Sequence, residues 1–242
     1  MLPKRETSMK SGGSRVVIIL GMHRSGTSSL AGILEGAGLT LGKVSRQNLF
    51  NPKGNLESKK IIDLNDALLR HNGGAWDNPP ARIDWPEALK QERDLIIRGY
   101  RDSLLWGFKD PRLLLTLDGW LEGLSGHGVS FAATFRRPGS VAQSLYKRNQ
   151  FSLEKSLFLW KTYNEKLLAY HEAFHFPVVS FDLPETDYRD AVERLLQRLA
   201  LTPDRRPGDF FENELRYEAQ APEADFPPEI ESLYKELERI AL

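Results

Sequence analysis

The chain has 242 residues, of which 40% are hydrophobic and none is cysteine, so it can bury a substantial core but forms neither disulfides nor thiolate metal sites. Basic and acidic residues each number 33, and the resulting formal net charge of zero argues against a general binder of nucleic acid or anionic membranes. No apolar run has the length of a membrane span, and the polar stretch 1–14 has the composition of a disordered lead-in rather than of a signal peptide. We therefore expect a cytoplasmic protein whose folded domain spans residues 15–242.

The hydrophobic pattern predicts short buried strands that alternate with helices. Strands are expected over 16–20, 39–41, 104–108, 129–135 and 178–181. Helices are expected over 27–35, 57–70, 85–103, 113–124, 139–149, 153–174, 188–199 and 229–242. This alternation is typical of βαβ units, and it predicts an α/β fold: a single P-loop-type, three-layer domain with a mainly parallel central sheet flanked by helices. Ligands on such sheets bind beyond the carboxyl ends of the strands.

Gly21–Ser28, which follows the first strand and opens the first helix, has the layout of a phosphate cradle. In such a loop the backbone N–H groups of small residues and of the helix N-terminus converge on an anion. The spacing from Gly21 to Gly26 matches the loop of nucleoside triphosphatases, but Thr27 stands where that loop carries lysine. A cation, Arg24, lies inside the loop instead. The sequence therefore predicts a site for a phosphate-like anion that lacks the lysine serving β- and γ-phosphates.

A second candidate anion site follows the strand that ends at Phe135. Arg136 and Arg137 come directly after this strand, and a helix begins at Pro138 or Gly139. On that helix Ser140 and Ser144 lie one turn apart and so share a face. Two anion sites at neighbouring strand ends favour a ligand with two separated phosphate-like groups.

These two motifs resemble those of sulfotransferases that use 3′-phosphoadenosine 5′-phosphosulfate (PAPS), and in particular their bacterial branch. The loop Arg24-Ser25-Gly26-Thr27 is similar to the family's first signature, and Arg136-Arg137-Pro138 with Ser144 keeps the spacing of the second. The segments 51–57, 109–112 and 160–164 are also similar to stretches of the bacterial members.

The resemblance implies where the donor would bind and what would do the chemistry. It assigns the donor site to loop residues and to two residues that follow the strand 129–135: His23, Arg24, Ser25, Gly26, Thr27, Ser28, Arg136 and Ser144. The loop would hold the 5′-phosphate, Arg136 and Ser144 the 3′-phosphate, and Arg24 the developing charge on the bridging oxygen. Glu57 is the candidate general base, PAP (3′-phosphoadenosine 5′-phosphate) the product, and no metal is expected.

Several of these residues also have a purely structural interpretation. Glu57, expected at a helix N-terminus, is equally suited to capping that helix, which helix electrostatics favour. The segment 109–112 also has two interpretations. In one, Lys109 or Arg112 contacts the donor or the acceptor. In the other, Asp110 and Arg112 form a pair that shapes the turn before a helix, and Pro111 is the first residue of that helix. Three residues of the long helix are expected in the core rather than at the acceptor: Trp160, Tyr163 and Asn164.

The predicted function is in-line transfer of a sulfuryl group from PAPS to a hydroxyl of a sugar, lipid or small molecule. The acceptor pocket is expected from the loops 41–55 and 71–85, which contain Phe50, Trp76 and Trp85. One alternative is a nucleotide or small-molecule kinase, which would need a phosphate-binding lysine and usually a magnesium-binding acid after a strand. Another is a catalytically silent protein that binds PAPS or PAP. Neither the acceptor nor the oligomeric state follows from the sequence.

Overall fold

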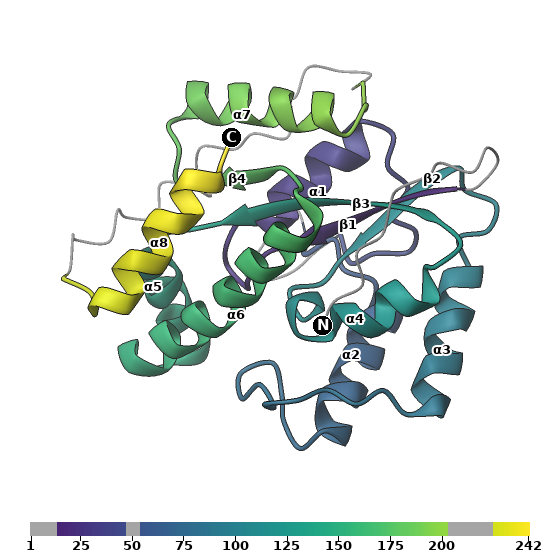
Figure 1. The fold of residues 1–242 in the computed structure, drawn as a ribbon, viewed down its shortest axis with the longest axis horizontal. Helices are drawn as coiled ribbons and strands as arrows, with labels where there is room; N and C mark the ends of the chain where they lie inside the picture. The colour runs from purple at the N-terminus through teal and green to yellow at the C-terminus, as the bar shows by residue number, and fades with distance from the viewer. Residues whose placement is uncertain (1–13, 47–53, 203–224) are drawn as a thin grey trace.

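The computed structural model describes residues 14–46, 54–202 and 225–242. Within these ranges four parallel strands form one sheet in the order β2-β1-β3-β4 (Figure 1). The strands are β1 (Arg15–Leu20), β2 (Leu105–Lys109), β3 (Gly128–Phe135) and β4 (Val178–Ser180). In the register Ile19 lies beside Lys109 and Leu20 beside Ala133, so the loop after β1 leaves the sheet where its two neighbours also end.

Helices cover both faces of the sheet, which gives the three layers that the sequence predicts (Figure 1). One face packs against α1 (Thr27–Gly36) and α7 (Glu185–Arg198). The other packs against α2 (Lys59–His71), α3 (Glu87–Arg98), α4 (Leu113–Gly123), α5 (Pro138–Asn149), α6 (Leu153–Phe174) and α8 (Pro228–Ile240). The fold is thus α/β with a parallel sheet between two layers of helices.

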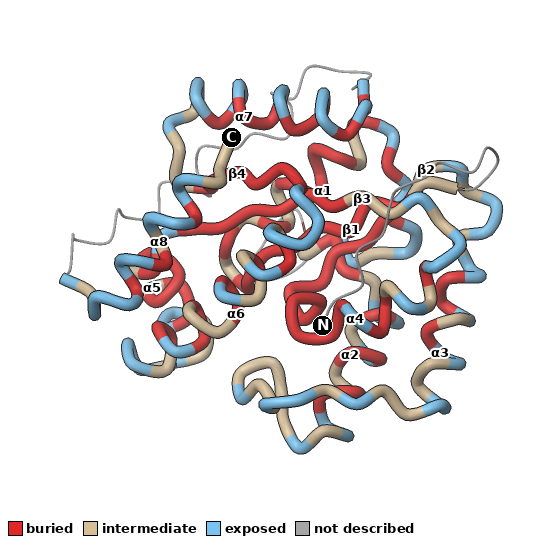
Figure 2. The backbone as a smooth tube through the Cα atoms, viewed as in Figure 1, coloured by how far each residue is buried: buried red, intermediate tan, exposed pale blue. Residues whose placement is uncertain are grey.

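The apolar run of β1 explains why it lies at the centre of the sheet. Val16, Ile18 and Leu20 contribute to the core on one face, and Val17 and Ile19 to the core on the other. All five side chains are fully buried, and Figure 2 shows the strand in the buried class apart from its first residue, which is intermediate. Burying one such side chain stabilises the fold by about 1.5–3 kcal/mol, so the strand that carries the Gly21–Ser28 loop is firmly held.

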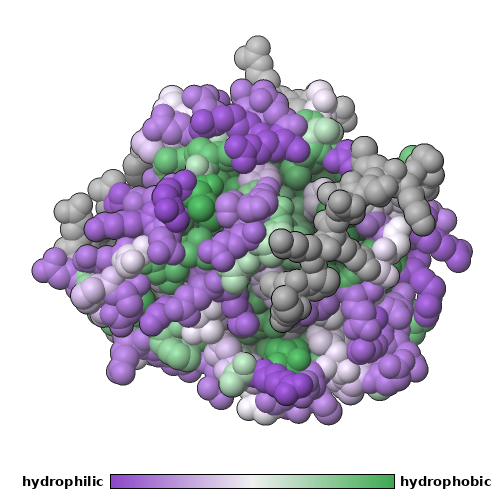
Figure 3. Space-filling model, in the orientation of Figure 1, coloured by the Kyte–Doolittle hydropathy of each residue, from purple (hydrophilic) through white to green (hydrophobic). Residues whose placement is uncertain are grey.

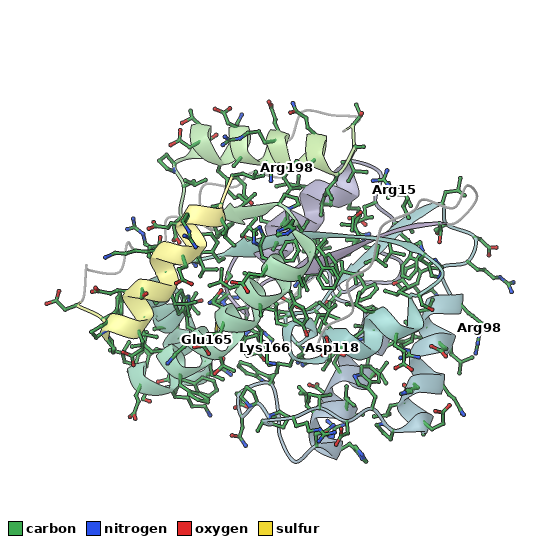
Figure 4. The ribbon with its side chains drawn as sticks, in the orientation of Figure 1. Arg15, Arg98, Asp118, Glu165, Lys166 and Arg198 are labelled. Atoms are coloured by element: carbon green, nitrogen blue, oxygen red, sulfur yellow. The ribbon has the colours of Figure 1, made fainter. Side chains whose placement is uncertain are left out.

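Polar contacts add to the packing, both within the helical layer that contains α4 and α6 and at the start of β1. Tyr170 on α6 donates a hydrogen bond to Asp118 on α4 at 3.2 Å; Asp118 is labelled in Figure 4 where these helices approach. Ser14, at the end of the expected lead-in, hydrogen-bonds His127 at 2.8 Å and accepts from Trp106 at 3.2 Å. The rest of that lead-in and Phe50 lie outside the described residues.

The expected elements are confirmed except for one strand, and several boundaries are corrected. Residues 39–41 form no strand; Thr40 makes only an isolated bridge to Trp106. Helix α2 begins at Lys59, two residues later than expected, because Leu56 has a left-handed backbone (φ 52°) and Ser58 is extended (φ −78°, ψ 125°). Helix α4 begins at Leu113, so Pro111 is not at its first position. Helix α3 begins only after Pro86, which disfavours helical backbone at the residue before it.

Two further features concern the surface. The face seen in Figure 3 is mainly hydrophilic, with apolar side chains visible between the helices. Among the residues that the structure describes, no helix combines the length and the apolar character that crossing a bilayer requires.

Candidate active site

The Gly21–Ser28 loop is held in a tight conformation that depends on glycine. Gly26 caps α1 with φ 85°, and a Cβ atom there would collide with the ring of Phe181. Gly21 has φ 147°, and a Cβ atom there would collide with the carbonyl oxygen of Thr134. Arg24 itself has a left-handed backbone, with φ 69°. These positions wind the loop closely around the start of α1, as a backbone cradle requires.

The loop also buries polar atoms that find no partner within the described part of the chain. These atoms are Ser25 Oγ and His23 Nε2. A buried polar group without a hydrogen bond costs about 1–3 kcal/mol, and a ligand that supplies the bond removes that cost. The first turn of α1 carries no acidic side chain, so nothing in it opposes the positive end of the helix dipole. The residues present therefore fit an anion at this loop.

Arg24 reaches out of the loop to α5. Its Nε donates a hydrogen bond to Ser144 Oγ at 2.7 Å, across the edge of the sheet. The sequence interpretation grouped Ser144 with Arg136, whereas the contact seen here is with Arg24. The two candidate anion sites are therefore adjacent, and residues of both converge on one edge.

Glu57 is joined to the loop through Lys109, the last residue of β2. Lys109 Nζ donates to Glu57 Oε1 at 2.6 Å and to Ser28 Oγ at 3.2 Å. The Lys109 side chain is only 2% exposed. Ser28 in turn donates to the carbonyl oxygen of Asn55 at 3.1 Å, which ties the segment before Glu57 to α1. The carboxylate thus stands beside the cradle, and it does not cap α2, because Ser58 occupies the N-cap position.

The residues that follow Lys109 form a second, largely structural network. Arg112 pairs with Asp110 at 2.9 Å and with Asp66 on α2 at 2.6 Å. The other oxygen of Asp110 accepts from Asn65 at 3.0 Å, and Asn65 also accepts from Trp120 at 2.9 Å. The pair between Asp110 and Arg112 that the sequence suggested does form. Of the two cations considered there, Lys109 contacts the candidate site and Arg112 holds α2 against the turn before α4.

Arg136 is engaged with an acid that the sequence interpretation missed. Its Nε lies 3.5 Å from Asp182 Oδ1, and its guanidinium carbon lies 5.4 Å from the centre of the Phe181 ring. Burial raises the pKa of Asp182 above its usual range, against the opposing effects of the Arg137 backbone N–H and of Arg136. The Arg136 carbonyl oxygen accepts from Trp160 at 2.9 Å. Trp160 is fully buried, as expected for a core residue.

An aromatic wall is formed by His23, which belongs to the loop, and by Trp76 and Tyr163, which lie outside it. The His23 ring lies 4.4 Å from Trp76 and 6.1 Å from Tyr163 between ring centres, and Tyr163 donates to the Trp76 carbonyl oxygen at 2.8 Å. Burial lowers the pKa of His23 well below 6.5, and the charges of nearby arginines and Lys109 lower it further, so the imidazole is neutral at pH 7. Trp76 was recognised from sequence only as one apolar residue of a variable loop.

No protein-family model and no curated protein matches the chain. Among solved structures, the fold is similar to that of sulfotransferase STF1 from Mycobacterium tuberculosis H37Rv, with a TM-score of 0.48 and 13% identity over 93% of this chain and 77% of that one. It is also similar to the sulfotransferase domain of the Synechococcus PCC 7002 olefin synthase, with a TM-score of 0.45 and 16% identity over 98% of this chain and 93% of that one. For the sulfotransferase domain from the curacin biosynthetic pathway the TM-score is 0.44 and the identity is 17%, and the match covers 95% of this chain and 92% of that one.

These structural neighbours are sulfotransferases. With TM-scores of 0.44–0.48 and identities of 13–17%, the likeness carries neither an activity nor a set of functional residues to this chain. What the site of this chain does is therefore argued from its own residues.

Proposed function

We propose that this chain transfers a sulfuryl group from PAPS to a hydroxyl group of a sugar, lipid or small molecule. The observation that carries the proposal is the position of Lys109, which brings a buried cation to the anion loop and holds Glu57 beside it, 2.6 Å from Lys109 Nζ. The cation that the loop sequence lacks at Thr27 thus comes from the neighbouring strand. The same cation fixes a carboxylate where an acceptor could approach.

The donor would be held by groups from both anion motifs. Backbone N–H groups over 25–28, with the start of α1, would bind the 5′-phosphate, and Ser25 Oγ has an unused hydrogen-bonding capacity there. Arg136 and Ser144 would bind the 3′-phosphate. Arg24, already joined to Ser144, would lie between the two phosphates and stabilise negative charge on the departing oxygen.

When bound, PAPS supplies a sulfuryl group already attached to a good leaving group, the 5′-phosphate of PAP. The part of this chain is to position the acceptor and take its proton. Glu57 accepts the hydroxyl proton, and its hydrogen bond to Lys109 does not prevent this, because a carboxylate has lone pairs for several hydrogen bonds. The aromatic wall formed by Trp76, His23 and Tyr163 would shield the acceptor from water.

The contacts made by Asp110 weigh against the kinase alternative. This acid follows a strand, where a kinase would place a magnesium ligand, but its oxygens already accept from Arg112 and Asn65. Both partners are buried with it, so releasing Asp110 for a metal would break a buried network.

The proposal is tested by comparing PAP with ADP, which lacks the 3′-phosphate, in calorimetric titrations of wild type and Arg136→Ala. We expect the wild type to prefer PAP, and the variant to lose about 10- to 100-fold in PAP affinity, as for loss of a charge-assisted hydrogen bond. Arg137→Ala is the matched control, since Arg137 is the adjacent but exposed arginine. Equal binding of PAP and ADP by the wild type would contradict the proposal and favour the kinase alternative.

A further inference from the structure

Helix α5 presents a polar face toward the loop. Arg148 belongs to this face and has no part in the function proposed above. Ser140, Ser144 and Arg148 follow one another at intervals of four residues, so they lie in a row along one side of the helix. Ser144 accepts the hydrogen bond of Arg24, which fixes this row against the anion loop. Arg148, one turn beyond Ser144, is half-buried rather than exposed.

Arg148 has only neutral partners in the described part of the chain. Its Nε donates to the side chain of its neighbour Asn149 at 2.6 Å, and its guanidinium carbon lies 5.3 Å from the centre of the Trp76 ring. No carboxylate of residues 14–46, 54–202 and 225–242 lies within 4.0 Å of it. Three other cations of this edge differ, because each has an acid within that distance: Lys109, Arg112 and Arg136.

The surroundings of Arg148 are positive on balance. Burial lowers the pKa of Arg148 to about 10; the charges of Arg24 and Arg112 also lower it, while that of Glu57 raises it. An exposed arginine is commonly unpaired, but a half-buried one beside like charges is costly unless an anion is bound there. The packing against Trp76 holds the guanidinium in place, so its free N–H groups are oriented before any ligand arrives.

We propose that Arg148 binds the sulfuryl group of the donor, an inference that rests on the proposed function. Arg148 lies one helical turn beyond Ser144, which accepts the hydrogen bond of Arg24, the residue assigned to the phosphate side of the bond to be broken. Arg148 also interacts electrostatically with Glu57, which is assigned to the acceptor hydroxyl. The group that lies between a leaving phosphate and an attacking hydroxyl is the sulfuryl group. Arg148 thus orients the oxygens of the group being transferred and distinguishes PAPS from PAP.

The experiment compares PAPS with PAP, which differ only in the sulfuryl group. Both are titrated calorimetrically, without acceptor, into wild type, Arg148→Ala, Arg148→Lys and Lys147→Ala, and chromatography confirms that the PAPS stays intact. Arg148→Ala should weaken PAPS binding by about 10- to 100-fold while PAP affinity changes by less than about threefold. Arg148→Lys, which keeps the charge without the fork of donors, should show an intermediate loss. Lys147→Ala removes one exposed positive charge from the same helix and should change neither affinity.

PAP binding also reports that each variant is folded. Equal losses for PAP and PAPS would overturn the inference and place Arg148 at a phosphate instead. Unchanged binding of both PAP and PAPS by Arg148→Ala would also overturn the inference. The anion that Arg148 binds would then be an acidic group of the acceptor. If Arg148→Ala does not fold, Arg148→Lys decides between these outcomes. Failure of the wild type to bind PAP would instead overturn the proposed function.

Discussion

Two ion pairs at the same edge of the sheet differ in how tightly they are closed. Lys109, the last residue of β2, lies 2.6 Å from Glu57 and also bonds Ser28. Arg136, just after β3, lies 3.5 Å from Asp182, and its Nε makes no hydrogen bond to the described residues. Both cations are buried. Lys109 donates a hydrogen bond to its nearest carboxylate, whereas the Nε of Arg136 does not.

The difference indicates two uses of a buried cation. The pair of Lys109 and Glu57 is a fixed unit, in which the cation determines where the carboxylate stands. The pair of Arg136 and Asp182 is open, so a phosphate could take the place of the acid as the partner of the guanidinium. Because a guanidinium matches both carboxylate and phosphate, such an exchange needs little movement of the arginine.

The largest expected effect comes from removing the charge of Glu57 while keeping its shape. Glu57→Gln should lower the turnover of PAPS with an active acceptor by about 10²–10⁴-fold, because the proton acceptor is lost. The amide oxygen can still accept from Lys109, so PAP affinity should stay close to that of the wild type. Radiolabelled sulfuryl transfer and PAP calorimetry on the same preparations measure both quantities.

Asp66→Asn is the matched control, since it makes the same change in an acid that pairs with Arg112 rather than with Lys109. Its turnover should remain within about tenfold of wild type. Comparable losses in the two variants would show that Glu57 contributes as part of a charge network and not as the base.

The second prediction concerns the folding stability that the closed pair provides. Lys109→Met leaves Glu57 buried without its cation, and should lower the free energy of unfolding by about 3–5 kcal/mol. The double variant Lys109→Met, Glu57→Leu removes both charges and should recover most of this loss. Urea denaturation of both variants and of the wild type gives the comparison. A double variant no more stable than Lys109→Met would show that packing around Lys109, and not the charge of Glu57, sets the cost.

The smallest expected effect tests whether the open pair competes with phosphate. Asp182→Asn keeps an oxygen for the Arg137 backbone N–H but removes the negative charge beside Arg136. PAP should then bind more tightly, by about two- to tenfold, because Arg136 no longer has to break its ion pair with Asp182 before it binds the 3′-phosphate. Calorimetry with PAP, and with ADP as the ligand that lacks this phosphate, measures the change. Weaker PAP binding in the variant would mean that Asp182 orients Arg136 rather than competing for it.

The elements of the fold were predictable because each is signalled locally. The apolar run of β1, the glycines of the loop and Pro138 at the start of α5 each determine structure within a few residues. The helix expected from Glu57 starts late because the left-handed backbone of Leu56 leaves no trace in hydrophobic periodicity. Such a boundary is set by contacts of the loop and not by the helix itself.

The partners within the site could not be predicted in the same way. Lys109 meets Glu57 across 52 positions, and Arg24 meets Ser144 across 120, so both contacts exist only once the strands are ordered side by side. Asp182 was missed because it follows β4, a three-residue strand with no motif after it. The sequence identified the residue types that the chemistry needs, while the sheet order decides which of them meet.

The contact between Gly26 and Phe181 has a consequence for how this loop would respond to random mutation. The phenyl ring occupies the space that any larger side chain at position 26 would need. In a library randomised at this position and sorted only for expression level, glycine would be enriched before any ligand was offered. A glycine retained in a phosphate-type loop can thus reflect the demands of chain folding alone, and only the serines and arginines around it report on the ligand.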